Sequence, residues 1–156
     1  MTQSKTQDGK ATTTKTTFSR ETSVSTSIAA DPAILWALLT NLSDVPRWNS
    51  TVTSIKGEIK VGETIELKST LDKKRTFKLK VKEVVPGKRL VWGDAQGTRV
   101  YSLEKGTGGV LFSMSEKIGG PLFPLFASMI PAFDESFEKF AADLKKEAET
   151  IQRSKK

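Results

Sequence analysis

Residues 119–151 read GGPLFPLFASMIPAFDESFEKFAADLKKEAETI, and the second half of this segment has the pattern of one long amphipathic helix. From Phe133 to Ile151 the apolar residues recur at steps of 4, 3, 4, 4 and 3, which places them on one helical face. A helix with one broad apolar stripe needs a surface to cover. Because the rest of the chain is mostly strand-like, we predict that this helix lies across a sheet.

The preceding chain has the alternation and β-branched composition of strands in seven segments. Between the first and second of them, Asp31-Pro32 is typical of a helix start, and a second short helix or turn carries Trp48. The later connections have hairpin length, which favours antiparallel pairing. We therefore predict an α+β helix-grip fold: a curved antiparallel sheet of about seven strands round a long C-terminal helix, with two short helices after the first strand. The predicted strands are 20–28, 51–57, 64–71, 75–81, 90–92, 99–103 and 110–118.

The chain of 156 residues has the length of one domain. Residues 1–17 are rich in Thr, Lys and Gln and offer little to bury, so we expect a disordered tail there. Residues 18–152 form the predicted domain, and residues 153–156 form a basic C-terminal tail.

The chain contains neither cysteine nor histidine. This excludes disulfides, thiolate chemistry and histidine-based catalysis, and it favours binding over enzymatic turnover. The acidic residues are scattered, so we predict no metal and no cofactor. The N-terminus lacks the apolar segment of a secretory signal, and no apolar segment is long enough to span a membrane. We expect a soluble cytoplasmic protein without integral membrane association.

The net charge of +7 lies mostly at the chain ends. Residues 1–20 hold four basic residues and one acidic residue, and residues 153–156 add three basic ones, which leaves about +1 for the folded part. A further basic cluster has no aromatic residue alternating with it, so we interpret it as a solvated outer sheet face and predict no nucleic-acid partner. This cluster is Lys68, Lys73, Lys74, Arg75, Lys78, Lys80 and Lys82.

Six short motifs follow one another along the chain: ADPAILW at 30–36, VPRWN at 45–49, PGKRLVW at 86–92, GGVLFSMSE at 108–116, GGP at 119–121 and FEKFAADLK at 137–145. Their order and spacing resemble the SRPBCC superfamily (helix-grip, Bet v 1-like or START-like proteins), and within it the polyketide cyclase/dehydrase-type group. The resemblance covers about residues 20–152. It implies an internal cavity but no single reaction, because the superfamily includes lipid carriers, receptors, cyclases and co-chaperone domains.

A filled core and an apolar cavity would place the same aromatic and methionine side chains inside the fold. The spacing alone favours a filled core. The proline-interrupted segment 121–131 and the resemblance favour a cavity. The predicted lining is Trp48, Leu67, Phe77, Leu79, Trp92, Tyr101, Phe112, Met114, Glu116, Phe126, Met129, Ile130 and Phe133.

Two polar residues on the predicted inner face are the candidates for catalysis or ligand orientation. Glu116 shares its face with Phe112 and Met114 and could act as a general acid or base. An ion pair at the rim of the sheet, with Arg99 or Lys117, is the plainer interpretation. Tyr101 could donate its hydroxyl to a ligand carbonyl, or could be an ordinary core tyrosine.

We therefore expect the protein to bind a hydrophobic or amphipathic small molecule, lipid- or polyketide-like, between the sheet and the C-terminal helix. One alternative is a polyketide cyclase/dehydratase-like enzyme that uses Glu116 and Tyr101. Another is a co-chaperone-type interaction domain that uses the outer sheet face. The segment from Pro121 to Ile130 is the expected entrance for a ligand, and the pattern carries no signal for an oligomeric state.

Overall fold

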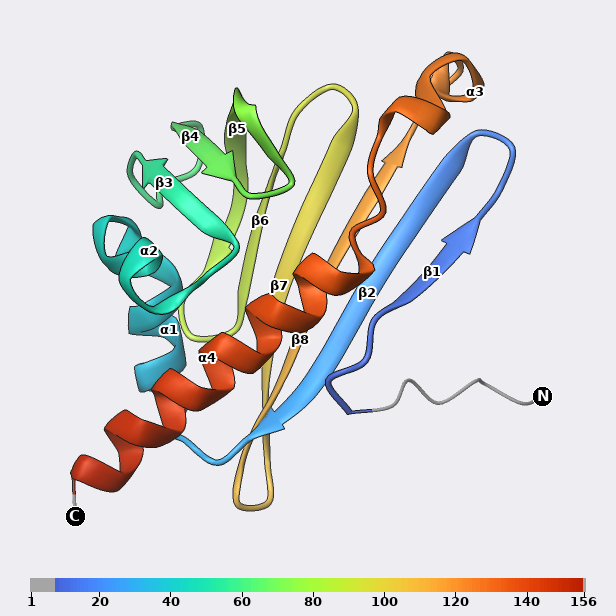
Figure 1. Ribbon diagram of the computed structural model, residues 1–156. Coiled ribbons are helices and arrows are strands. Elements are labelled where there is room, and N and C mark those ends of the chain that lie inside the picture. Colours follow the sequence, from blue (N-terminus) through green and yellow to red (C-terminus); the bar gives the residue numbers. More distant parts are fainter. Residues whose placement is uncertain (1–7, 156) are drawn as a thin grey trace.

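The computed structural model describes residues 8–155, where a long helix crosses one face of an antiparallel sheet (Figure 1). The eight strands have the order β1-β2-β8-β7-β6-β5-β4-β3. This arrangement confirms the predicted α+β helix-grip fold. The strands are β1 Thr12–Lys15, β2 Ser19–Ile28, β3 Val52–Lys56, β4 Thr64–Ser69, β5 Asp72–Val85, β6 Arg89–Gly93, β7 Gly97–Gly106 and β8 Gly109–Gly119. The helical elements are α1 Pro32–Thr40, η1 Leu42–Asp44, α2 Val45–Trp48, α3 Phe123–Phe126, η2 Ala127–Met129 and α4 Asp134–Ser154.

The structure has one strand more than predicted. This strand is β1, and it forms within the segment that the sequence predicts to be disordered. It pairs with β2 along its whole length. Thr13 Oγ1 donates to Asp134 Oδ1 at 2.8 Å, and Ala11 N donates to Glu138 Oε2 at 2.9 Å. These anchors lie more than a hundred residues away on α4, so nothing in the local sequence reveals them. The predicted start of order at Phe18 is therefore wrong for residues 8–17, while residues 1–7 lie outside the described part.

The crossover from β2 to β3 contains the two predicted short helices, α1 and α2, joined by η1. Asp31 is the N-cap of α1, and its side chain accepts a hydrogen bond from Ala33 N at 2.9 Å. Pro32 at the first helical position fits there because that position needs no N–H donor. Figure 1 shows these helices beside the C-terminal half of α4 and next to β3. Their buried residues are Ile34, Leu35, Leu38, Leu39, Leu42, Val45 and Trp48.

The apolar stripe of α4 faces the sheet, as the sequence predicts. Its buried residues are Phe137, Phe140, Ala141, Leu144 and Ala148. The helix continues to Ser154, so the predicted tail at 153 begins inside the last turn. Arg153 lies in that turn, where its positive charge interacts favourably with the negative end of the helix dipole.

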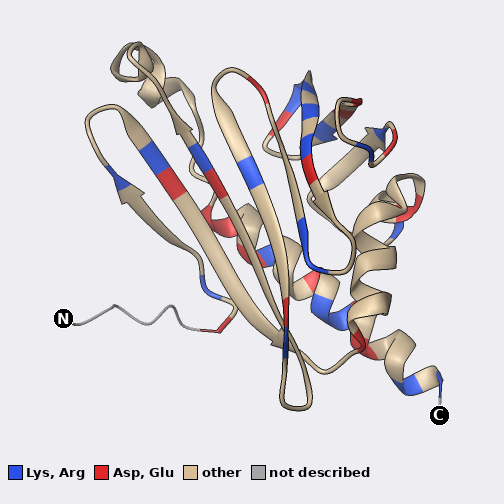
Figure 2. Ribbon diagram, turned by 180° about the vertical axis from the view of Figure 1, so that it is seen from behind, with Lys and Arg blue, Asp and Glu red and all other residues tan. Residues whose placement is uncertain are grey.

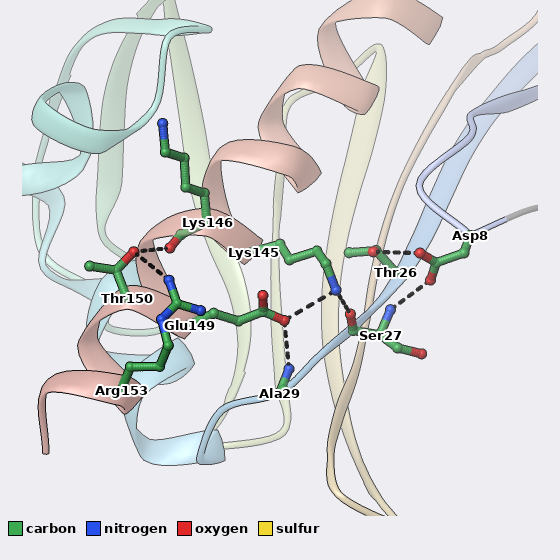
Figure 3. A network of polar contacts seen from close by, with 9 residues as sticks. All are labelled: Asp8, Thr26, Ser27, Ala29, Lys145, Lys146, Glu149, Thr150 and Arg153. Carbon is green, nitrogen blue, oxygen red and sulfur yellow. Dashed lines mark hydrogen bonds and ion pairs between the residues drawn. The ribbon is translucent and has the colours of Figure 1, made fainter. Parts of the chain in front are cut away.

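The C-terminal half of α4 is tied to β2 and the loop after it (Figure 3). Glu149 Oε2 accepts from Ala29 N at 2.9 Å and pairs with Lys145 Nζ at 3.1 Å. Lys145 Nζ also donates to Ser27 O. The Ala29 N–H lowers the pKa of Glu149, with a smaller contribution from Lys145, and partial burial opposes the effect. These contacts fix one end of the helix to the sheet.

The outer face of the sheet is exposed to solvent (Figure 2). On β5 the lysines Lys78 and Lys80 are exposed, whereas Val81 is fully buried on the opposite face. This alternation sets one dry and one wet face. Among residues 8–155, no helix is long and apolar enough to cross a bilayer.

Candidate ligand cavity

The contact between α4 and the sheet is solid in its middle and C-terminal parts. The Phe140 ring stacks on Phe112 with centroids 6.3 Å apart and lies 5.7 Å from Tyr101. Its edge contact with Trp48 measures 5.9 Å. Leu144 and Ala148 continue the contact and are fully buried. This part of the interior is a packed aromatic and aliphatic core.

The contact is hollow at the N-terminal end of α4. A cavity of about 140 Å³ lies between the inner face of the sheet and the segment that leads into the helix. Nine of the predicted cavity residues line it: Leu67, Phe77, Leu79, Trp92, Met114, Glu116, Met129, Ile130 and Phe133. Eight polar residues outside the predicted cavity set also line it, namely Thr51, Ser69, Asp72, Arg75, Asp94, Gln96, Arg99 and Ser136.

Four predicted residues lie elsewhere. Phe112 is fully buried in the solid core, and Phe126 packs edge-on against Phe123 at 5.7 Å. Trp48 and Tyr101 line a separate space of about 20 Å³ next to the main cavity. The strand alternation identifies inward residues correctly, but it does not distinguish those that meet another side chain from those that meet a void.

A row of inward side chains crosses three strands at the wall of the main cavity. Trp92 on β6 lies opposite Arg99 on β7, and Arg99 lies opposite Glu116 on β8. Arg99 Nε donates to Glu116 Oε1 at 2.6 Å, and both side chains are less than one fifth exposed. The Arg99 guanidinium also lies 5.1 Å from the centre of the Phe137 ring. Glu116 therefore forms the ion pair with Arg99, but it does so at the cavity wall.

The electrostatics of this row follow from its burial. Burial disfavours the charge on Arg99, but the Glu116 carboxylate and the Tyr101 hydroxyl beside it raise its pKa above the ordinary value. Burial also raises the pKa of Tyr101, although the nearby Arg99 guanidinium opposes this. At neutral pH the phenol is thus protonated and the guanidinium charged. Both groups can donate hydrogen bonds.

The segment between β8 and α4 forms one side of the cavity. Met129 lines the cavity yet is 79% exposed, and Leu125 nearby in the chain is 77% exposed. Arg20 on β2 holds the end of this segment, since it donates to Ile130 O at 3.2 Å and to Pro131 O at 2.8 Å. Its guanidinium lies 5.0 Å from the centre of the Phe133 ring.

Arg20 is a site-forming residue that the sequence reasoning missed. It is only 8% exposed because it faces inward, on the same face of β2 as the alternate residues Thr22 and Val24. That alternation was the available signal, since an arginine at an inward position of a strand requires partners inside the fold. Arg75, which the sequence places in the solvated cluster, also lines the cavity, 4.5 Å from the centre of the Phe77 ring.

A protein-family model described as polyketide cyclase / dehydrase and lipid transport matches residues 19–149. The chain therefore belongs to this family, within the SRPBCC superfamily. No curated protein matches the chain.

Solved structures share the fold. A protein of Rhodobacter sphaeroides is similar with a TM-score of 0.66 and 21% identity, over 88% of this chain and 97% of that one. A START superfamily protein of Mycobacterium smegmatis has a TM-score of 0.61 and 15% identity, over 84% and 98%. The di-domain ARO/CYC protein BexL, from the BE-7585A biosynthetic pathway, has a TM-score of 0.65 and 11% identity, over 86% and 52%. At these identities the similarity concerns the fold alone.

Proposed function

We propose that this protein binds a hydrophobic or amphipathic small molecule, lipid- or polyketide-like, in the cavity under the N-terminal end of α4. The observation that carries the proposal is a cavity of about 140 Å³ whose walls combine apolar side chains with a few polar groups. Small-molecule sites have this character: an apolar body with a small number of orienting polar groups. The family description, which names both cyclases and lipid transport, supports the same class of ligand.

The cavity volume limits what the enclosed part of a ligand can be. An engineered apolar cavity of roughly 150 Å³ binds benzene. By that measure this cavity of about 140 Å³ accommodates one aromatic ring or a short acyl segment. A longer ligand has to extend beyond the enclosed part, past the exposed apolar side chain of Met129. We therefore propose that the segment 121–131 is the entrance.

The state of the two candidate catalytic groups supports binding over turnover. Oε1 of Glu116 is occupied by Arg99. The raised pKa of Tyr101 makes its phenol a hydrogen-bond donor and a poor base at neutral pH. In the cyclase/dehydratase-like alternative Glu116 performs the acid–base step, and Glu116→Gln would then abolish turnover while ligand affinity stays the same.

A cavity-filling variant tests the binding site. Leu79→Trp on β5 places a larger side chain in the cavity, whereas Leu111→Trp adds the same bulk on the outer face of β8, where Leu111 is 39% exposed. Titration with the neutral fluorescent probe N-phenyl-1-naphthylamine should show affinity reduced by about tenfold or more in Leu79→Trp, or about 1.4 kcal/mol. Leu111→Trp should bind as the wild type does. Equal affinities in all three proteins would refute the proposed site.

A further inference from the structure

Two buried indole N–H groups have no hydrogen-bond partner. Among residues 8–155, Trp48 Nε1 and Trp92 Nε1 are the buried side-chain nitrogen or oxygen atoms without one. The two residues are only 8% and 3% exposed. An unpaired buried donor costs roughly 1–3 kcal/mol, so most such groups in folded proteins find an acceptor. Both residues line one small space, so an acceptor for them can come from outside the chain.

Both tryptophans line the same small space, which we name the donor niche. It is lined by Trp48, Trp92, Arg99 and Tyr101 among other residues, and its volume is about 20 Å³. That volume suits one oxygen-sized group. Trp92 and Arg99 also line the main cavity, so the niche adjoins it directly. A ligand whose apolar body occupies the main cavity can therefore place one polar atom in the niche.

The polar groups around the niche are almost entirely donors. An indole has a donor and no acceptor, and a guanidinium likewise has only donors. Arg99 commits Nε to Glu116 and has further N–H groups. Burial keeps the Tyr101 phenol protonated, because it raises the pKa of that group. An atom placed among these groups is best satisfied if it is an oxygen acceptor.

The charge balance distinguishes a neutral acceptor from an anionic one. The positive charge of Arg99 is already offset by Glu116 at 2.6 Å. The other charged side chains that line the main cavity are Asp72, Asp94 and Arg75, so acidic groups outnumber basic ones there. A carboxylate ligand would meet this excess of negative charge and would compete with Glu116 for Arg99. A neutral carbonyl oxygen avoids both costs and still accepts hydrogen bonds.

We propose that the donor niche receives the carbonyl oxygen of a neutral ligand, a ketone or an ester, whose apolar body fills the main cavity. This rests on the proposed function and narrows it to carbonyl-bearing, polyketide-like molecules as opposed to free fatty acids. The indoles of Trp48 and Trp92 supply the specificity for oxygen, and the apolar walls supply the affinity for the hydrocarbon part.

Three probes that share one ring system test this proposal on the wild-type protein. Acetophenone carries a ketone, isopropylbenzene replaces it with a hydrocarbon group of similar shape, and benzoate carries a carboxylate. Binding is followed by NMR of the three indole N–H resonances, with Trp36 on α1 as the internal control. The ketone should bind about 2–10-fold more tightly than the hydrocarbon and also more tightly than the carboxylate. It should shift the Trp48 and Trp92 resonances and leave that of Trp36 in place.

A pair of variants then assigns the preference to the niche. Trp92→Phe removes one donor and keeps an aromatic ring, so the ratio of ketone affinity to hydrocarbon affinity should fall towards one. Trp36→Phe should leave this ratio unchanged.

Equal binding of ketone and hydrocarbon by the wild type would contradict the proposed role of the donor niche but not the proposed apolar site. Tightest binding of benzoate would overturn the neutral-carbonyl assignment. If no probe binds, the proposed function fails as well. The wild-type titration decides these outcomes even if Trp92→Phe does not fold.

Discussion

The two ends of α4 meet the same sheet in different ways. Towards the C-terminus, Leu144 and Ala148 are fully buried, and Phe140 packs against three aromatic rings and borders only the small donor niche of about 20 Å³. At the N-terminus, Phe133 and Ser136 border a cavity of about 140 Å³. Both ends carry inward apolar side chains at helical spacing. The difference therefore arises from what lies opposite the helix: at one end other side chains fill the space, and at the other they do not.

The two ends of α4 also differ in the polar contacts that hold them. The C-terminal half is bound to β2 and the following loop by Lys145 and Glu149, as Figure 3 shows. At the other end, Arg20 on β2 holds the segment before the helix by donating hydrogen bonds to two of its backbone carbonyls. The first turns of α4 are also tied to β1, through Asp134 and Glu138. The segment before the helix, and not the helix itself, is therefore the part that Arg20 holds.

Truncation of the same residue type at the two ends should have unequal costs. Phe140→Ala removes a ring from the solid core and should lower the free energy of unfolding by about 3–5 kcal/mol. Phe133→Ala should cost about half as much, because a ring that borders a cavity makes fewer contacts to lose. Urea denaturation of both variants measures the difference. Equal losses would mean that the two ends are packed alike.

Removal of Arg99 should leave the Glu116 carboxylate unpaired at the wall of the hollow end. Arg99→Met is expected to cost about 2–3 kcal/mol, somewhat less than for a fully buried pair because both side chains are slightly exposed. The double variant Arg99→Met with Glu116→Gln should regain part of this loss. Glu83→Gln breaks the exposed pair with Arg89 and serves as the control, with an effect under about 1 kcal/mol. A double variant no more stable than Arg99→Met would contradict the assignment.

Arg20→Met should release the entrance without loosening the C-terminal half of α4. It removes two hydrogen bonds to the carbonyls of Ile130 and Pro131 and the contact with the Phe133 ring, and should lower stability by about 1–2 kcal/mol. Hydrogen exchange should accelerate in residues 121–133, while the amides of Leu144 to Ala148 keep their protection. Acceleration spread evenly along α4 would show that Arg20 has no special hold on the entrance.

The smallest expected effect concerns the tether of the C-terminal half of α4 at acid pH. The pKa of Glu149 is lower in the folded protein than its ordinary value of 4.5, so its ionised form stabilises the fold above that pH. The contribution is lost as pH falls through the ordinary value and below the folded one. Wild type should therefore exceed Glu149→Gln in stability at pH 7, and the difference should shrink as pH falls below 4.5.

The control for this experiment is Glu135→Gln, since Glu135 pairs with Lys139 but its side chain is 82% exposed. Its stability difference from wild type should stay small throughout. A difference between wild type and Glu149→Gln that persists unchanged at about pH 3 would exclude the carboxylate as the source.

The sequence predicts the regular parts of this fold and misses the parts held by distant polar groups. The stripe from Phe137 to Ala148 and the alternation in β5 and β8 predict the helix, the strands and their buried faces, because each pattern is local. The strand β1 has no such pattern. Asp134 and Glu138, both on α4, hold it in place, and only the folded chain brings them near it.

The same limit applies to the cavity. Phe112 and Met114 are successive inward residues of β8, yet Phe112 is packed in the core and Met114 lines the cavity. The sequence predicts that both residues line the cavity, because strand alternation shows only which face of the sheet a side chain lies on. The unpaired indoles of Trp48 and Trp92 are likewise invisible in the sequence, because whether a donor has a partner depends on atoms from other elements.

Xenon binding tests the contrast between the two ends most directly. Xenon enters dry apolar cavities of roughly 150 Å³, so its position in crystals under xenon pressure marks empty space in the interior. We predict one xenon site among Leu79, Met114 and Phe133, and none beside Phe140 or Leu144. Xenon beside Leu144, or an interior without any xenon site, would contradict the account of a hollow and a solid end.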